Sequence, residues 1–394
     1  MKITDVNIWF SAYPLQRPLH MSSGIIRSVP QVFVKIQAVS GKKTVVGLGH
    51  NSYSPLWADR RIIPYKEKER QIRHAILAIK TRLKSSSFKH PINFYEKFVF
   101  GDPGQIPRLA YVMAFSPFDL ALWDAYAKLQ KKHIFALPEV KKRMSADTKG
   151  FLEVTHLVDI DASLRSVADT AKKEGMTSYK IKLRGEPVLD AERINSFAEM
   201  GFVRTILADA NEAYTSEKKL RQWLGMLSIE SERKIFFLEQ PFPRNSRKRL
   251  PAIKNIVFAA DESYANHRDI EKIWNMGYRG VALKPHTKTF SGTLLTLDAI
   301  KKRNMSFGIM DLTTAPPIGY FVGALTAAHL PTAGPLELNG RQFYRNWGKL
   351  VDRGFKNRRD AFLCRKDKIK IACDYAKPGW GIGESEFDAY INGR

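Results

Sequence analysis

Hydrophobic and polar positions follow a strand pattern at the start of the chain and a helical pattern soon after it. KITDVNIWF (residues 2–10) and QVFVKIQAV (31–39) are rich in β-branched and aromatic residues and predict two strands, separated by the turn-like MSSGIIRSVP (21–30). EKERQIRHAILAIKTRL (67–83) has apolar residues at helical spacing. SPFDLALWDAYAKL (116–129) predicts a further helix that begins at its Ser-Pro pair. Strands followed by helices in one block predict a small α+β domain.

After about residue 150, short apolar strands alternate regularly with amphipathic stretches such as DASLRSVADTAKKEG (161–175). Eight such strands favour an α/β fold of the (β/α)8-type, TIM-like barrel kind. We therefore expect an N-terminal α+β capping domain in residues 1–130, a barrel in 131–350, and a C-terminal segment, 351–394, that packs back towards the cap. The predicted strands are FLEVTHLV, YKIKL, VRTILA, KIFFLE, NIVFAA, RGVALK, MSFGIM and GPLEL.

Composition adds limits on class and compartment. The 394 residues are 44% hydrophobic and 26% charged, which is enough for a large core, and no run of about 18 apolar residues predicts a membrane span. Two cysteines, Cys364 and Cys373, give no disulfide framework, and the start of the chain has no signal-peptide core, so we expect a cytoplasmic protein. The net charge of +25 is interpreted as a solvated, lysine-rich surface that attracts small anions. No nucleic-acid-binding pattern accompanies it, so no nucleic-acid partner is expected.

Charged residues recur at the carboxyl ends of the predicted strands, where barrel enzymes place their chemistry. Lys180 and Lys182 share one face of the second strand, and the later positions follow at steps of 22 to 30 residues, about one βα unit each. The later positions are Asp209, Glu239, Asp261, Lys284, Asp311 and Glu337.

Three consecutive strand ends carry a carboxylate: Asp209, Glu239 and Asp261. Carboxylates that converge at a barrel mouth repel one another unless a hard cation lies among them, and an all-oxygen ligand set favours Mg²⁺, with Mn²⁺ possible. This predicted acidic centre also explains why two lysines, Lys180 and Lys182, lie side by side on the neighbouring strand.

The lysines and the metal together suggest abstraction of an α-proton next to a carboxylate. A divalent ion that binds the carboxylate stabilises the negative charge that develops when this proton leaves. Lys182 becomes an effective base if Lys180 and the metal lower its pKa from about 10.4. Lys284 lies four strands further round and is expected to face Lys182 across the mouth, so that one lysine removes a proton and the other returns it.

With these residues, nearly the whole chain resembles the enolase superfamily, in its muconate-lactonizing-enzyme-like subgroup. SPFDLALWDAYAK resembles a helical segment of the family's cap, and PGWGIG (378–383) resembles the family's ending PGLG. The resemblance implies that Lys182 is an acid/base tuned by Lys180, that Lys284 is the opposing base, and that the three strand-end carboxylates bind the metal. The mandelate-racemase-like pairing of an aspartate at strand six with a histidine at strand seven is absent, because these positions hold Lys284 and Asp311.

The chain departs from the resemblance where the substrate is held. Dipeptide epimerases of the subgroup carry Asp-x-Asp at strand eight for a substrate ammonium, whereas this chain has Glu337-Leu338-Asn339. Asp311 is an alternative partner for an ammonium, or else a cap of the following helix. Two cap loops, about 19–25 and 49–53, are expected to complete the pocket. The candidate substrate-binding residues are Asn211, Asp311, Glu337, Asn339, His50 and Tyr53.

The leading functional hypothesis is a metal-dependent racemase or epimerase of an N-acyl amino acid or a dipeptide, a small carboxylate substrate. The same residues also suit a lyase or cycloisomerase, similar to o-succinylbenzoate synthase, muconate cycloisomerase or an acid-sugar dehydratase. A non-catalytic basic binding protein on this fold is a remote third reading. Relatives in the subgroup are often homo-oligomers, and this is the expectation by analogy.

Overall fold

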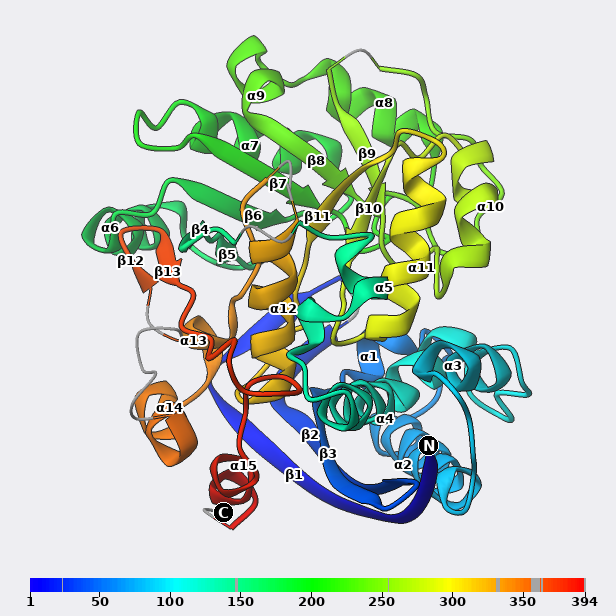
Figure 1. Ribbon diagram of the computed structural model, residues 1–394. Helices are drawn as coiled ribbons and strands as arrows, with labels where there is room; N and C mark the ends of the chain where they lie inside the picture. The colour runs from blue at the N-terminus through cyan, green and yellow to red at the C-terminus, as the bar shows by residue number, and fades with distance from the viewer. Residues whose placement is uncertain are drawn as a thin grey trace.

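A three-stranded antiparallel sheet, β1 (Lys2–Met21), β2 (Gly24–Ser40) and β3 (Lys43–Ser52), begins the chain in this computed structural model (Figure 1). The structure describes residues 1–22, 24–145, 148–253, 255–330, 334–355, 362 and 364–392. The predicted turn over residues 21–30 is wrong for most of its length. Leu19 pairs with Ile26 and Met21 with Gly24, whose φ of 132° fits a reversal that only glycine makes easily.

Helices α2 (Tyr65–Leu83) and α4 (Arg108–Leu129) pack on this sheet, and α1 (Pro55–Ala58) and α3 (Pro91–Val99) pack against α4. They share a core of apolar side chains with the strands, and the helix predicted over 67–83 is confirmed as α2. The start predicted for the last helix is wrong, because α4 begins at Arg108 and Pro117 lies inside it. Nearly every residue of α4 is buried, so packing outweighs the hydrogen bond that the proline removes.

Glycine at position 49 permits the closest approach between β3 and α4. A Cβ atom there would lie 1.8 Å from the carbonyl oxygen of Pro117 and 2.8 Å from the amide nitrogen of Ala121, which are backbone atoms that cannot rotate away. We expect Gly49→Ala to lower the free energy of unfolding by about 1–3 kcal/mol or more, measured by urea denaturation. Gly225→Ala is the matched control, since nothing lies within 4 Å of its added Cβ. Equal urea midpoints for the two variants would contradict this packing.

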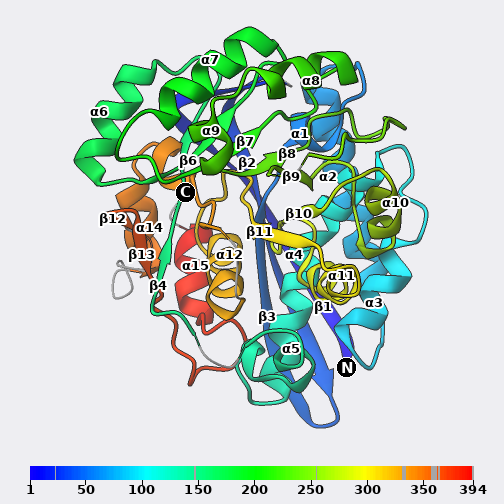
Figure 2. The same ribbon diagram turned by 90° about the horizontal axis from the view of Figure 1, so that it is seen from above.

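Seven parallel strands follow in the spatial order β11-β10-β9-β8-β7-β6-β5, a curled sheet of the half-barrel kind. Helices surround it on the outside (Figure 2). The inner face packs Leu207, Phe237, Ala259, Ala282 and Met310 together. The strands are β5 (His156–Val158), β6 (Ser178–Lys182), β7 (Thr205–Asp209), β8 (Ile235–Glu239), β9 (Val257–Ala260), β10 (Gly280–Leu283) and β11 (Ser306–Ile309), and the outer helices are α6 (Leu164–Glu174), α7 (Pro187–Ala198), α8 (Glu217–Gly225), α9 (Ile229–Lys234), α10 (Ile270–Asn275), α11 (Phe290–Lys301) and α12 (Ile318–His329).

The predicted eighth strand, GPLEL (334–338), is not a regular strand. Its backbone nevertheless forms hydrogen bonds at both edges of the seven-stranded sheet, to β11 at one edge and to the segment before β5 at the other. The Leu336 amide donates to the Glu153 carbonyl at 2.8 Å, and the Glu337 amide donates to the Ile309 carbonyl of β11 at 3.1 Å. Glu153 belongs to β4 (Phe151–Glu153), which precedes β5 and pairs with β13 (Lys368–Lys370) near the end of the chain.

The C-terminal part contacts the first sheet and its helices. Lys35 of β2 forms ion pairs with Glu384 and Asp388 of α15 (Glu384–Asn392), and the Trp380 amide donates to Asp124 of α4 at 2.9 Å. Short elements complete the chain: α5 (Pro138–Lys141), α13 (Gly340–Phe343), α14 (Trp347–Phe355), β12 (Cys364–Arg365) and two 3-10 turns at Ile134–Ala136 and His267–Asp269. None of the helices in the described part of the chain has the length and apolar character needed to cross a membrane.

Candidate active site

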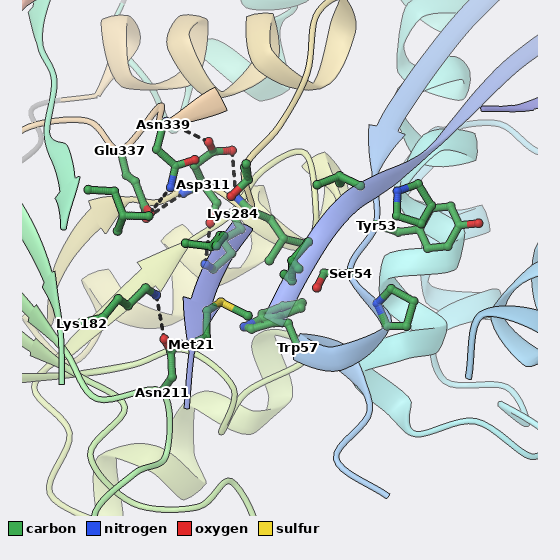
Figure 3. Close-up of a pocket in the computed structure, with 18 of the residues that line it drawn as sticks. Met21, Tyr53, Ser54, Trp57, Lys182, Asn211, Lys284, Asp311, Glu337 and Asn339 are labelled. Carbon is green, nitrogen blue, oxygen red and sulfur yellow. Dashed lines mark hydrogen bonds between the residues drawn. The ribbon is translucent and has the colours of Figure 1, made fainter. Parts of the chain in front are cut away.

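A pocket lies between the carboxyl ends of the parallel strands and the N-terminal sheet (Figure 3). Its floor holds lysine, carboxylate and amide side chains from the strand ends, and its roof is mainly apolar. The floor residues are Lys180, Lys182, Asn211, Lys284, Asp311, Glu337 and Asn339, and the roof includes Leu19, Met21, Ile26, Val29, Tyr53 and Trp57. The structure therefore brings together most of the side chains that the strand-end pattern indicated.

Lys180 lies at the centre of three carboxylates. Its Nζ is 2.8 Å from Glu239, 2.8 Å from Glu337 and 3.0 Å from Asp209, and its side chain is only 1% exposed. Burial alone would lower the pKa of Lys180, but the three negative charges more than offset this and hold it well above its ordinary value. Lys180 is therefore a fixed cation in this arrangement.

Lys182 projects from the same strand two residues later, on the same face. Its Nζ is 2.6 Å from Asp209 and donates to the side-chain oxygen of Asn211 at 2.7 Å. Strand β6 is buried at every position, so the solvated-face interpretation of the Lys-x-Lys pattern is excluded. The acidic surroundings expected for this pair are present.

Lys284 follows β10, which is separated from β6 by three strands of the sheet. Its Nζ donates to the Asp311 carbonyl at 2.8 Å and lies 3.2 Å from a carboxylate oxygen of Asp261. Burial lowers the pKa of Lys284, but the negative charges of Asp261, Glu239 and Glu337 together, with Asp261 the largest of them, raise it above the ordinary value. A catalytic base needs the opposite shift, so Asp261 holds Lys284 protonated as long as their ion pair persists.

The three predicted metal ligands end adjacent strands. Asp209 and Glu239 pair in register between β7 and β8, and Asp261 directly follows β9. Burial and the negative charges of Asp209 and Asp261 raise the pKa of Glu239 to about 7, whereas Lys180 and Lys182 outweigh burial at Asp209 and lower its pKa to about 2. Among the described residues, no three metal-ligating side chains lie close enough together to bind an ion as they stand. Lysines instead contact carboxylate oxygens of Asp209 and Asp261.

The donor set nevertheless fits a divalent cation. One Glu239 oxygen, Oε1, is buried without a hydrogen-bond partner, in a side chain that is 0% exposed. A carboxylate oxygen in that position is costly unless it is protonated or bound to a cation. Glu239 therefore sits where a hard ion with oxygen ligands would be favourable, between two further carboxylates.

Asp311 and Glu337, at the ends of the predicted seventh and eighth strands, already accept hydrogen bonds from other groups of the protein. Asp311 accepts from the amides of Leu312, Thr314 and Asn339, as a cap of the turn after its strand does. Glu337 accepts from Lys180, from the Asp311 amide and from the Asn339 side chain. Both carboxylates line the pocket, yet neither has an oxygen without a hydrogen bond.

The two cap candidates lie in different places. Tyr53 lines the pocket, and its hydroxyl accepts from Arg73 at 3.3 Å. His50 does not line it: the ring is fully buried against Phe33, with Nε2 3.1 Å from the Gln31 side chain, and burial lowers its pKa to about 3. The placement of His50 among substrate-binding residues was therefore wrong, because strand alternation turns its side chain into the core.

Sequence reasoning missed two residues that meet at Asp261. The Lys288 Nζ lies 2.9 Å from Asp261 Oδ1 and donates to its carbonyl at 2.6 Å, and the Trp57 indole donates to Oδ2 at 3.2 Å. Burial, followed by Lys284, lowers the pKa of Lys288 to about 8 against the opposing effect of Asp261. Lys288 was detectable as a second lysine four residues after Lys284, whereas Trp57 comes from the cap and gave no comparable signal.

Comparisons with known proteins agree with this architecture. The family model described as enolase C-terminal domain-like matches residues 163–382, more than half of the chain. A D-Ala-D/L-Ala epimerase of Cytophaga hutchinsonii is 26% identical over 281 residues, 69% of each chain, and an L-Ala-D/L-Glu epimerase of Clostridium acetobutylicum is 25% identical over 282 residues, 70% of this chain and 72% of that one.

Solved structures share the whole fold. A dipeptide epimerase from Enterococcus faecalis, crystallised with Mg and the dipeptide L-Leu-L-Tyr, superposes with a TM-score of 0.72 at 17% identity, covering 98% of this chain and 100% of that one. This structure, and that of a mandelate racemase/muconate lactonizing protein from Herpetosiphon aurantiacus, support a fold of a capping domain with a TIM-like barrel for this chain. The resemblance seen in the sequence is thus confirmed: the chain belongs to the enolase superfamily of enzymes, in the group of mandelate racemase and muconate lactonizing enzyme.

Proposed function

We propose that this enzyme is a racemase or epimerase that moves the α-proton of a small carboxylate substrate. The observation that carries the proposal is the pair of lysines, Lys182 and Lys284. They enter one pocket from β6 and from the end of β10, two strands near opposite edges of the sheet (Figure 3). One amine accepts the α-proton, and the ammonium of the other donates a proton to the opposite face of the planar intermediate. The proton count balances, and the configuration at the α-carbon is inverted.

The three strand-end carboxylates, Asp209, Glu239 and Asp261, would hold a Mg²⁺ ion in this proposal. The unpartnered oxygen of Glu239 and its two acidic neighbours support this assignment. When bound, such an ion stabilises the negative charge that develops on the substrate carboxylate. With Asp261 and Glu239 engaged in this way, two of the three carboxylates that raise the pKa of Lys284 would stabilise its ammonium less strongly, which favours Lys284 as a base.

We further infer that residues 334–338 close the parallel sheet into a (β/α)8 barrel, with Glu337 directed into its mouth. Hydrogen bonds from this segment reach Glu153 on one side and Ile309 on the other, which supports closure. Glu337 is thereby placed beside Lys180, where it adds a further negative charge and helps to keep that lysine protonated.

The substrate best supported by the pocket is an N-acyl amino acid rather than a dipeptide with a free ammonium. Both lining carboxylates beyond the proposed metal ligands, Asp311 and Glu337, already accept hydrogen bonds from the protein. A substrate ammonium would have to compete with those donors, of which Lys180 at Glu337 is itself a cation, and weakening hydrogen bonds of buried carboxylates is costly. The apolar roof around Met21, Ile26 and Trp57 suits an uncharged acyl group or a hydrophobic side chain.

A matched substrate pair tests this proposal. N-propionyl-L-leucine and L-alanyl-L-leucine place the same side chain beside the reacting carbon and differ only in the ammonium group that the alanyl residue carries. Incubation with the enzyme and Mg²⁺ in D₂O, followed by proton NMR, should show loss of the α-proton signal with inversion. We expect kcat/KM for the N-acyl compound to exceed that for the dipeptide by at least about tenfold.

Each outcome of this experiment bears on a different part of the proposal. A faster dipeptide would refute the substrate assignment and leave the two-lysine chemistry intact. Consumption to a new product without inversion would favour a lyase or cycloisomerase. No exchange with a wider panel of N-acyl amino acids, dipeptides and acid sugars would refute the function itself.

A further inference from the structure

We propose that Trp57, carried by the cap, is a positioning residue for Asp261 and Lys284. Its indole Nε1 donates to Asp261 Oδ2 at 3.2 Å, and Lys284 Nζ approaches the same oxygen to 3.2 Å. The centre of the indole ring lies 5.3 Å from that Nζ, within the range of a cation–π contact. Trp57 thus touches both the proposed metal ligand and the proposed base. This inference rests on the proposed function.

Tryptophan is suited to this position because it offers an N–H donor and an aromatic face on one rigid side chain. The N–H fixes which way the Asp261 carboxylate faces, while the ring bounds the space into which the Lys284 amine can move. Lys288 holds the other oxygen of Asp261, so the carboxylate is fixed from both sides. Figure 3 shows Trp57 on the cap side of the pocket, away from Asp311 and Glu337.

The barrel loops hold Trp57 in place through its backbone. The guanidinium of Arg244, which follows β8, donates to the Trp57 carbonyl at 2.8 Å and to the Ala58 carbonyl at 3.2 Å. Glu212, which follows β7, fixes that guanidinium with bonds of 2.9 and 2.7 Å. These carbonyls lie at the C-terminal end of the short helix α1, where no further turn satisfies them.

The position of the cap on the parallel sheet is therefore coupled to the positions of Asp261 and Lys284. A shift of α1 away from Arg244 would withdraw the indole N–H from Asp261 and the ring from Lys284 in the same movement. Lys182 is held instead by Asp209 and Asn211, neither of which contacts Trp57 in the bonds described above. Loss of Trp57 should therefore damage the Lys284 face of the reaction and spare the Lys182 face.

The first arm of the test needs no substrate. Trp57→Phe keeps an aromatic ring and removes the N–H, so we expect Mg²⁺ affinity, measured by calorimetry, to fall about tenfold, as when a group that orients a metal ligand is lost. Trp274→Phe is the matched control, because that indole also packs on a cation, Arg279 at 3.9 Å, but lies outside the pocket.

The second arm measures α-proton exchange in D₂O separately for each enantiomer, at a Mg²⁺ concentration that saturates every variant, because both directions of the reaction need the ion. The enantiomer served by Lys284 is defined as the one whose exchange disappears in Lys284→Ala. In Trp57→Phe we expect its exchange to fall about 10- to 100-fold, the range produced by small displacements of a catalytic group, with the other enantiomer changed by less than about twofold. Arg244→Gln should show the same asymmetry. Arg268→Gln, which removes another barrel-to-cap contact at Phe100, should not.

Equal losses for the two enantiomers, or unchanged Mg²⁺ affinity together with unchanged exchange, would overturn the positioning role and leave Trp57 as a structural residue. If the wild-type enzyme exchanges no substrate while Trp57→Phe still weakens Mg²⁺ binding, the proposed function fails and the orientation of Asp261 by Trp57 stands.

Discussion

Replacing Lys182 with alanine is expected to abolish racemisation while α-proton exchange of one enantiomer survives. In a two-base mechanism each lysine handles the proton on its own face, so the variant still removes the proton that faces Lys284. Inversion requires both lysines, and we expect its rate to fall by about 10²- to 10⁴-fold, the usual contribution of a general acid or base. Lys284→Ala should give the mirror result, with exchange of the other enantiomer retained.

The measurement is proton NMR in D₂O on each pure enantiomer, with circular dichroism and Mg²⁺ calorimetry to show that the variants fold and bind the ion. Lys219→Ala is a suitable control, because this exposed lysine pairs with Glu186 on the outer surface. Retention of exchange for both enantiomers in Lys182→Ala, or loss of both in each single variant, would be incompatible with one base per face.

Much of the parallel sheet could be predicted because a buried parallel strand is a short apolar run that ends in a loop. The strands β6 to β11 lie within or overlap the predicted segments. Once the strands were predicted, the charged residue at the end of each could be identified directly from the sequence. The first sheet was harder to predict. In MSSGIIRSVP, where glycine, serine and proline suggested a turn, β1 extends to Met21 and β2 already begins at Gly24, because pairing between long neighbouring strands outweighs local preference.

The helix α4 shows the same limit in another form. Ser116 and Pro117 looked like a helix start, yet the helix begins eight residues earlier and surrounds the proline with buried contacts. The Ser116 hydroxyl donates to the His286 carbonyl of the barrel, a partner that no local pattern reveals. A proline in a helix fixed on all sides costs less than the packing that would be lost by breaking the helix.

The candidate site likewise contains residues that the sequence predicted and residues that only the folded structure reveals. Residues on consecutive strand ends, such as Lys182, Asp209 and Glu239, were predictable because a curled parallel sheet brings the carboxyl ends of its strands together. Trp57 and Arg244 were not, since they meet only when the cap is seated on the barrel. His50 was misplaced because the sequence suggested a loop at a position that lies inside β3, where alternation decides which side chains face the pocket.

Glu239→Gln is expected to remove most of the Mg²⁺ affinity and, with it, the α-proton exchange. The substitution keeps the size of the side chain but takes away one of three negative charges and one ligand oxygen. We expect the dissociation constant, measured by calorimetry, to rise by about 100-fold or more, beyond the range seen for residues that only support a ligand. Chelation with EDTA should likewise stop exchange in the wild-type enzyme, and added Mg²⁺ should restore it.

The same variant should be more stable than the wild type when no metal is bound, and this distinguishes a metal site from a purely structural carboxylate. The pKa of Glu239 is raised to about 7, so its buried charge opposes folding, and stability falls as pH rises from about 4.5 through 7. Glutamine carries no charge, so with EDTA present the variant should melt on the order of a few degrees higher at pH 8 and show little difference at pH 5. Saturating Mg²⁺ at pH 8 should reverse the order, because the ion stabilises only a protein that binds it. If Mg²⁺ raised both melting temperatures equally, the ion would be bound elsewhere and Glu239 would not be its ligand.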